Sequence, residues 1–157
     1  MNNYNKIQLR LPNANDFDLM VDIELNPENR NYTSLEMPDL NEIRAFLVSV
    51  HDLRKHEQIR FVIECNSEGV GFIDLYDTSF LLNQAYVGIL IKSKFRSLGI
   101  GSAALTKLKV VASTYGLKRL NAIVKTDNIN SINFFHKNGF KQEETLENEI
   151  QFTFLQD

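Results

Sequence analysis

The sequence predicts one α/β (α+β) domain, with a mixed and mostly antiparallel sheet of about seven strands and four flanking helices. The 157 residues, 43% hydrophobic and 24% charged, have the length and mix of one globular domain. Strand-type and helix-type hydrophobic periods follow in the order β-α-α-β-β-β-α-β-α-β-β. Because the sequence lacks repeats, low-complexity tracts and linkers rich in proline or glycine, we assign residues 1–157 to a single domain.

The first strand and the first two helices are predicted before residue 51. Residues 7–11 alternate between apolar and polar side chains, which predicts a strand that ends at Pro12. Asn15 is the candidate N-cap of a helix that stops near Pro27, with apolar positions at Phe17, Met20, Val21 and Leu25. Asp39 is the candidate N-cap of a second helix, whose i, i+3, i+4, i+7 spacing predicts a buried face of Ile43, Phe46, Leu47 and Val50.

Three strands follow these helices. Residues 60–65 are strand-like, and Asn-Ser-Glu-Gly at 66–69 is typical of a hairpin turn. Residues 70–76 supply the partner strand, and residues 85–91 form a third strand after a loop at 77–84.

The second half alternates between strands and helices. Gly99 opens a helix that Gly116 closes, with one apolar face at Ile100, Ala104, Leu108 and Val111. Residues 120–124 are almost wholly apolar, as in a strand buried on both faces. A helix over about 131–137 ends at Gly139, and strands at 140–145 and 150–155 complete the chain.

Charge and composition narrow the functional classes. A net charge of −3 argues against a nucleic-acid partner held by overall basicity. The sequence has no apolar run of roughly 20 residues that would span a membrane, no amino-terminal signal-peptide pattern, and a single cysteine, Cys65. From these features we expect a cytoplasmic protein without membrane partners. Since His51 and His56 would lie about 140° apart on a helix, we expect no metal site.

The distribution of charge along the chain is more informative about function than the net charge. Residues 11–43 hold one base and eight acids: Asp16, Asp18, Asp22, Glu24, Glu28, Glu36, Asp39 and Glu42. Residues 92–109 hold no acid and five bases: Lys92, Lys94, Arg96, Lys107 and Lys109. Either set can be ordinary solvated surface, but the second surrounds a glycine turn that could attract an anion.

The glycine turn is the most informative segment. It lies between an apolar strand and an amphipathic helix and reads Arg96, Ser97, Leu98, Gly99, Ile100, Gly101, Ser102. Such a junction presents backbone N–H groups at the positive end of a helix dipole, which suits phosphate. A purely structural turn is one alternative. A dinucleotide site of the G-x-G-x-x-A type is another, but residues 119–124 offer no acid at the expected distance.

With a second motif, this turn resembles the GNAT superfamily of N-acetyltransferases, closest to its ribosomal-protein N-terminal and spermidine acetyltransferase branch. The first motif is R-x-x-G-x-G after a strand, and the second runs through residues 124–140 and ends in Lys-x-Gly-Phe. The resemblance implies a sheet splayed in its middle, with acetyl-CoA as cofactor. It also implies transfer of the acetyl group to a primary amine of a cationic small molecule or peptide by direct attack. A catalytically silent acyl-CoA-binding module of the same fold, or a nucleotide-binding regulator, is the alternative.

The resemblance also implies a set of cofactor-binding residues. The strand before the turn would part from its neighbour, so that pantetheine meets the backbone of Ile89, Leu90 and Ile91. The diphosphate would lie on residues 96–102, and the second motif would line the cofactor with Asn128, Ser131, Phe134, Phe135 and Lys137. Gly88 either marks a β-bulge that splays the strand or relieves crowding.

The expected general acid is missing, because Phe135 stands where many relatives have a tyrosine. Tyr86 and His136 are the candidate substitutes for protonating the thiolate, and departure without a protein acid is the alternative. Tyr86 also replaces a glutamate that relatives of the spermidine branch carry.

In the family the first two helices and their connection form the acceptor wall. We expect Glu24, Tyr32 and Glu36 to contact the amine substrate of a monomer or homodimer. Glu24 falls near the apolar stripe of the first helix, where a carboxylate needs a partner, either a substrate cation or an arginine elsewhere in the fold.

Overall fold

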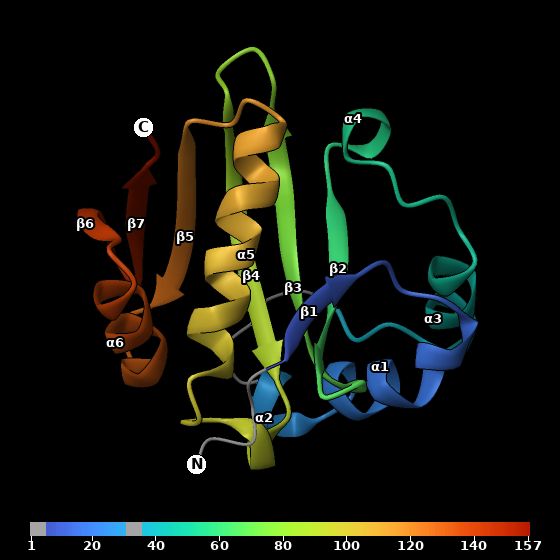
Figure 1. The fold of residues 1–157 in the computed structure, drawn as a ribbon. Coiled ribbons are helices and arrows are strands. Elements are labelled where there is room, and N and C mark those ends of the chain that lie inside the picture. The colour runs from blue at the N-terminus through green and yellow to red at the C-terminus, as the bar shows by residue number, and fades with distance from the viewer. Residues whose placement is uncertain (1–5, 31–35) are drawn as a thin grey trace.

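The computed structural model describes residues 6–30 and 36–157. Its centre is a seven-stranded sheet in the order β1-β2-β3-β4-β5-β7-β6 (Figure 1). All neighbours are antiparallel except β4 and β5, which run parallel. The strands are β1 (Ile7–Arg10), β2 (Ile59–Cys65), β3 (Glu68–Ser79), β4 (Gln84–Ile91), β5 (Arg119–Lys125), β6 (Lys141–Leu146) and β7 (Glu149–Leu155).

Helices cover both faces of this sheet. The two longest, which lie in front of the sheet in Figure 1, are α5 (Ile100–Thr114) and α6 (Ile129–Lys137). The other face is covered beside β2 and β3 by α1 (Phe17–Glu24) and α3 (Leu40–Leu47). The short elements are η1 (Ala14–Asp16), α2 (Pro27–Arg30), α4 (Leu53–His56) and η2 (Ser93–Phe95).

Strand alternation divides the apolar residues into two cores. Successive side chains of a strand point to opposite faces, so neighbours such as Val62 and Ile63 enter different layers. Ile63 and Ile73 pack in the large core beneath α5 and α6, whereas Val62 and Phe72 pack with α1 and α3. The α/β (α+β) fold class predicted from the sequence is therefore confirmed, with seven strands.

Several predicted boundaries are wrong. Neither α1 nor η1 is capped by Asn15: Asn13 caps η1 by accepting from the Asn15 N–H, and Asp16 is the N-cap position of α1. α1 does end near Pro27, at Glu24, but Pro27 also begins the short helix α2, as proline readily does at a first helical position. Since α3 ends at Leu47, Val50 lies beyond it and is exposed.

Elements in the middle of the chain also differ from the prediction. The structure adds α4, which Asp52 caps by accepting from two backbone N–H groups. His51 lies before that helix, so the two histidines do not share one helix as assumed. The loop expected at 77–84 is shorter, a turn over residues 80–83, because β3 and β4 pair out to Ser79 and Gln84. Among the described residues, no helix is long and apolar enough to cross a membrane.

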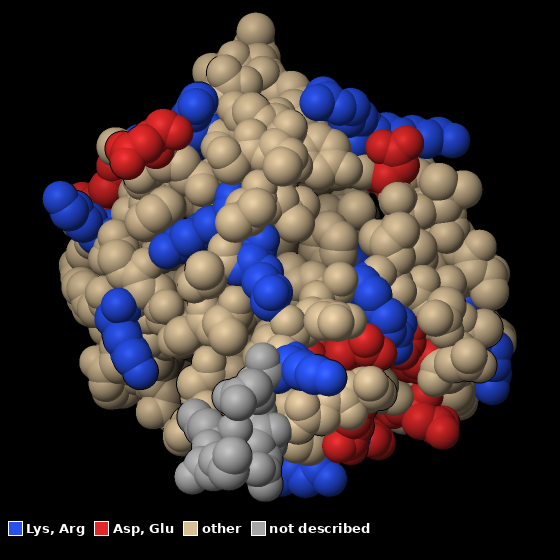
Figure 2. Space-filling model, in the orientation of Figure 1, with Lys and Arg blue, Asp and Glu red and all other residues tan. Residues whose placement is uncertain are grey.

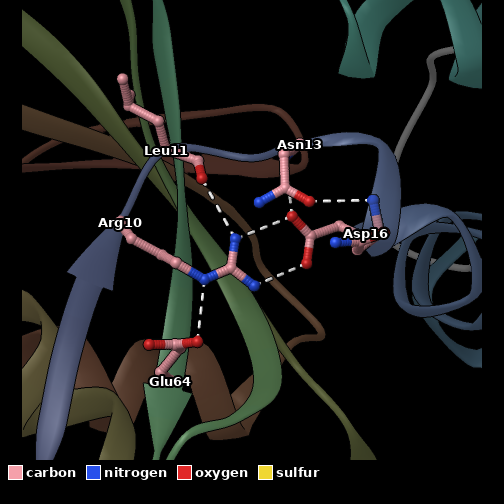
Figure 3. A network of polar contacts seen from close by, with 6 residues as sticks. Arg10, Leu11, Asn13, Asp16 and Glu64 are labelled. Carbon is pink, nitrogen blue, oxygen red and sulfur yellow. Dashed lines mark hydrogen bonds and ion pairs between the residues drawn. The ribbon is translucent and has the colours of Figure 1, made fainter.

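A polar network fastens β1 and β2 to the start of α1 (Figure 3). The Arg10 guanidinium donates to both oxygens of Asp16, at 2.7 and 2.8 Å, and to Glu64 on β2 at 2.8 Å. Asp16 is 4% exposed and also accepts from the Asn13 N–H. Burial raises the pKa of Asp16, but the hydrogen bonds from Arg10 and Asn13 outweigh it and hold that pKa below its ordinary value.

Candidate active site

The sheet loses its pairing between β4 and β5 halfway along β4. The parallel register runs only from Gln84 with Arg119 to Tyr86 with Asn121. Beyond that point β4 stays paired with β3 as far as Ile91, and β5 stays paired with β7 as far as Lys125. Figure 1 shows the lower ends of the two strands apart. The splay that the resemblance implied is therefore present, between residues 87–91 and 122–125.

Backbone directions on this part of β4 follow from one hydrogen bond. Lys92 N–H donates to Val70 O on the β3 side at 2.9 Å. Since N–H and C=O directions alternate along a strand, Leu90 also faces β3, and Ile89 and Ile91 face away from it. Ile89 and Ile91 can therefore offer backbone groups to a ligand. The backbone groups of Leu90 are directed at β3 instead, and the expected contact of these three residues with the cofactor stays a prediction.

Side chains from three elements converge beside these backbone groups. A Cβ added to Gly101, in the first turn of α5, would lie 3.1 Å from Phe134 Cε2 and 3.3 Å from Ile91 Cδ1. It would also lie 3.5 Å from Ile89 Cδ1. The structure thus brings together four predicted cofactor residues from β4, α5 and α6.

The glycine turn leaves the start of α5 without a side-chain cap. Gly99 is the N-cap, with φ of 82°, a value that favours glycine, and it supplies no capping side chain. The first N–H groups of α5 are therefore available to an external acceptor, as an anion site at a helix start requires. Ser97, Leu98 and Gly99 are exposed, whereas the side chain of Ile100 is buried in the core.

Arg96 connects this turn to the short helix α2. Its Nε donates to Ile91 O at 2.9 Å and its Nη2 donates to Asn29 Oδ1 at 2.9 Å. Glu28 Oε2, on α2, lies 3.7 Å from Arg96 Nη1. An anion at the turn would compete with these partners for the guanidinium.

The residues of the second motif have three different places in the structure: some cap a helix, some pack in the core and some lie on the surface. Asn128 caps α6 by accepting from Ser131 N–H at 3.3 Å. Ser102 accepts a hydrogen bond from Asn138 Nδ2 at 3.1 Å, which fastens α5 to the end of α6. Phe135 is 4% exposed and packs 5.1 Å from the Phe140 ring, so its ring belongs to the core.

The last two predicted residues of α6 lie on the surface. His136 and Lys137 are exposed, and the His136 ring lies edge-on, 5.0 Å from the Phe152 ring.

Two tyrosines mark the last paired position before the strands part. Tyr76 on β3 lies opposite Tyr86 on β4, with ring centroids 5.7 Å apart. Burial, then the charges of Asp77, Asp74 and other neighbours, raises the pKa of Tyr76 to about 12. Its hydroxyl therefore stays protonated at neutral pH. Across from Tyr86, the buried Asn121 accepts from Arg119 Nε and Thr153 Oγ1, both at 3.1 Å.

Glu24 has the arginine partner that the sequence left as an alternative. Arg60 Nη1 donates to Glu24 Oε1 at 2.6 Å, and Arg60 also donates to both oxygens of Asp74, at 2.8 and 2.9 Å. The Arg60 guanidinium lies 4.7 Å from the Phe72 ring centre. Glu24 is thus tied to the sheet by a half-buried network.

The acidic segment does not form a wall opposite a basic turn. Basic partners lie within 4 Å of four acids of this segment: Asp16, Asp22, Glu24 and Glu28. Two of these basic partners, Lys92 and Arg96, belong to the basic segment itself. Figure 2 accordingly shows red and blue side chains next to one another at the lower right. Glu36 is exposed, and Tyr32 lies outside the described residues.

An open hollow of about 450 Å³ lies between the first helices and the start of the glycine turn. It is lined by Asp22, Ile23, Asn26, Asn29, Lys92, Ser93 and Lys94. The lining includes neither tyrosine of the site nor residues 87–91, although Lys92 directly follows that stretch.

Sequence reasoning missed Asp74 and Tyr76. Both belong to the strand predicted at 70–76, where alternation places them on the face of Phe72 and away from Ile73 and Leu75. A carboxylate in the middle of an otherwise apolar strand was the available signal, because it requires a charged partner from another element.

Comparison with known proteins gives a family and several relatives. Residues 6–141 match the family model described as acetyltransferase (GNAT) domain. The spermidine N(1)-acetyltransferase of Escherichia coli K12 is 29% identical over 111 residues, which cover 66% of this chain and 58% of that relative. An N-alpha-acetyltransferase of Sulfurisphaera tokodaii is 29% identical over 118 residues, covering 68% of this chain and 71% of its own.

Two solved structures share the fold. Mycobacterium smegmatis RimJ, in complex with CoA-disulfide, superposes with a TM-score of 0.83 and 20% identity, over 95% of this chain and 81% of its own. Vibrio cholerae spermidine N-acetyltransferase, in complex with CoA and spermine, superposes with a TM-score of 0.83 and 17% identity, over 96% of this chain and 95% of its own. At these identities the likeness establishes the fold alone.

Proposed function

The chain belongs to the acetyltransferase (GNAT) family, and from this premise we propose that it transfers an acetyl group from acetyl-CoA to a primary amine of a cationic small molecule or peptide. The single observation that carries the proposal is the end of β4–β5 pairing at Tyr86 and Asn121, beside an uncapped α5 start. The first feature offers strand-like hydrogen bonds to pantetheine, and the second offers N–H groups to the diphosphate.

The cofactor's course follows from the same geometry. The backbone of Ile89 and Ile91 pairs with pantetheine, whose chain runs past Gly101 and Phe134 to the glycine turn. Arg96 exchanges Ile91 O and Asn29 for the diphosphate, since charge-assisted hydrogen bonds are the stronger ones. Structures of relatives that hold coenzyme A support this assignment.

The reaction is direct attack of a neutral amine on the thioester carbonyl. A C–N bond forms, the C–S bond breaks, the amine loses one proton and the departing thiolate gains one. A free amine has a pKa near 10, so its proton must pass to a base or to water before attack. The backbone N–H of Ile89, which faces away from β3, suits the oxyanion.

Tyr86 is the proposed donor of the thiolate's proton, because it lies where the strands part, whereas Phe135 is buried and has no proton to give. We expect Tyr86→Phe to lower kcat about 100-fold while the affinity for acetyl-CoA changes less than twofold. Steady-state kinetics and calorimetric titration with acetyl-CoA measure the two quantities. Tyr86→Phe with an unchanged kcat would remove Tyr86 from the acid role.

The activity itself is tested by incubating the protein and acetyl-CoA with spermidine, spermine and short peptides bearing free amino termini. Mass detection of an acetylated amine, with release of coenzyme A, is the expected result. The two classes of relative, a spermidine acetyltransferase and an N-alpha-acetyltransferase, motivate the panel.

A catalytically silent acyl-CoA-binding module is the second candidate, favoured by the buried Phe135 where many relatives have a tyrosine. Such a module would gain thermal stability from acetyl-CoA and show no turnover with any amine.

A further inference from the structure

Gly88 lies in the middle of β4, two residues beyond the last position paired with β5. The sequence suggested that it marks a bulge or relieves crowding, and the structure shows neither. Pairing with β3 continues without a register shift through Asp74 and Gly88, so no bulge is present there. A Cβ added at Gly88 would meet its nearest atom, Tyr76 Cε1, at 3.6 Å, which is an ordinary contact.

The fold therefore does not require glycine at this position. Glycine inside a strand weakens it, because it adds chain entropy and contributes no packing. A glycine that neither the backbone nor the packing requires suggests that a ligand approaches the strand closely. Gly88 keeps partial exposure to solvent, so its surface is accessible.

The surroundings of Gly88 suit a cationic amine. The added Cβ would lie 3.6 Å from the Tyr76 ring and 3.8 Å from Asp74 Oδ2, on the face opposite α5. Tyr86 lies on the same face, and its ring centre is 5.7 Å from that of Tyr76. An ammonium group is attracted to aromatic faces and to carboxylates. The adjacent residue, Ile89, turns its backbone toward the proposed thioester.

We propose that the acceptor amine binds over Gly88, between Tyr76, Tyr86 and Asp74, and that the missing side chain of Gly88 gives it the room to reach the thioester. The inference rests on the proposed acetyltransferase function and adds the residues that select the acceptor. Tyr76 supplies a ring face and a protonated hydroxyl, and Asp74, held by Arg60, supplies negative charge. Acetyl-CoA lies on the other side of β4 and is not obstructed by these groups.

The test adds side-chain volume at Gly88 and measures each substrate separately. Gly88→Ala and Gly88→Val are assayed with spermidine, spermine and an amino-terminal peptide, and acetyl-CoA affinity is measured by calorimetry. One added methyl group in such a pocket changes discrimination by about 10-fold or more. We therefore expect at least a tenfold higher acceptor KM for Gly88→Ala, a larger rise for Gly88→Val, and less than a twofold change in acetyl-CoA affinity.

Substitutions at Tyr76 test the proposed acceptor site independently of those at Gly88. Tyr76→Leu removes the ring and should raise the acceptor KM several-fold more than Tyr76→Phe, which keeps it. Tyr115→Phe is the matched control, because Tyr115 packs against Phe80 on the tip of the β3–β4 hairpin and should leave all constants unchanged.

Two outcomes separate this inference from the proposed function. An active wild-type protein whose Gly88→Val variant keeps its acceptor KM would overturn the acceptor site alone. A wild-type protein without turnover on any amine of the panel would overturn both.

Discussion

At the scale of single residues, Arg60 is the main polar anchor between the sheet and α1. Its guanidinium satisfies Glu24 and Asp74, and the three side chains are 15%, 14% and 23% exposed. Removing one member of a buried ion network is costly because the remaining charges lose their partner but stay out of water. Arg60 therefore fixes α1 and also holds the Asp74 carboxylate in place beside Gly88.

We expect Arg60→Met to lower the free energy of unfolding by about 3 kcal/mol, measured by urea denaturation, since it removes the guanidinium that donates to both oxygens of Asp74 and to Glu24. The matched control is Arg54→Met. Arg54 is exposed and stacks on Phe80 and Tyr115 at 4.9 and 5.3 Å, so its loss should cost about 1 kcal/mol or less. Equal losses in the two variants would contradict the role given to Arg60.

A second prediction at this scale concerns pH. The pKa of Asp16 is held below its ordinary value of 3.8, so the unfolded chain binds a proton at this carboxyl more readily than the native state does. Its contribution to stability is present above pH 3.8 and is lost as pH falls from there through the lower native pKa.

Urea titrations between pH 6 and pH 2.5 should show this loss in the wild-type protein. In Arg10→Met the main groups that lower the pKa are gone, so the slope below pH 4 should be smaller. An unchanged slope would show that Arg10 does not set the Asp16 pKa.

At the scale of elements, the sequence correctly predicted the caps and turns that a few adjacent residues determine. Asp39 does cap α3, and positive φ angles at Asn66 and Ser67 form the turn expected at 66–69. Gly99 and Gly116 bound α5 as expected, because caps and turns depend on a few adjacent residues.

Features that depend on residues far apart in the chain could not be predicted as well from the sequence. Glu24 was recognisable as a carboxylate that needs a partner, but Arg60 lies 36 residues away and only the folded sheet identifies it. The end of β4–β5 pairing came from a family resemblance, since nothing in residues 85–91 states which strand lies beside them. The surroundings of Gly88 depend on the β3–β4 register, which places Asp74 and Tyr76 beside it.

Gly101 tests the contact between α5 and the cofactor path. A Cβ here would already lie 3.1 Å from Phe134, so the two methyl groups of Gly101→Val must displace Phe134 or enter the space assigned to pantetheine. We expect acetyl-CoA affinity to fall at least tenfold, about 1.4 kcal/mol, by calorimetry. Ser113→Val, on an exposed position of the same helix, is the control and should bind normally. Normal binding by Gly101→Val would remove this glycine from the cofactor path.

At the scale of the whole molecule, one sheet separates two environments. The face under α5 and α6 carries the large apolar core and ends at the uncapped α5 start, which suits coenzyme A. The opposite face carries Tyr76, Tyr86 and the Arg60 network, which suit an amine. The loss of pairing between β4 and β5 is where the two faces meet, so both substrates can reach one point from opposite sides of β4.

The most direct measurement is a crystal structure of the protein with coenzyme A. We predict pantetheine amides about 2.9 Å from the backbone of Ile89 and Ile91, and the diphosphate on the N–H groups at the start of α5. The sulfur should lie beside Gly88 and Tyr86. Coenzyme A bound in the hollow lined by Asp22 and Lys92, or β4 and β5 pairing beyond Tyr86 in the complex, would contradict this account.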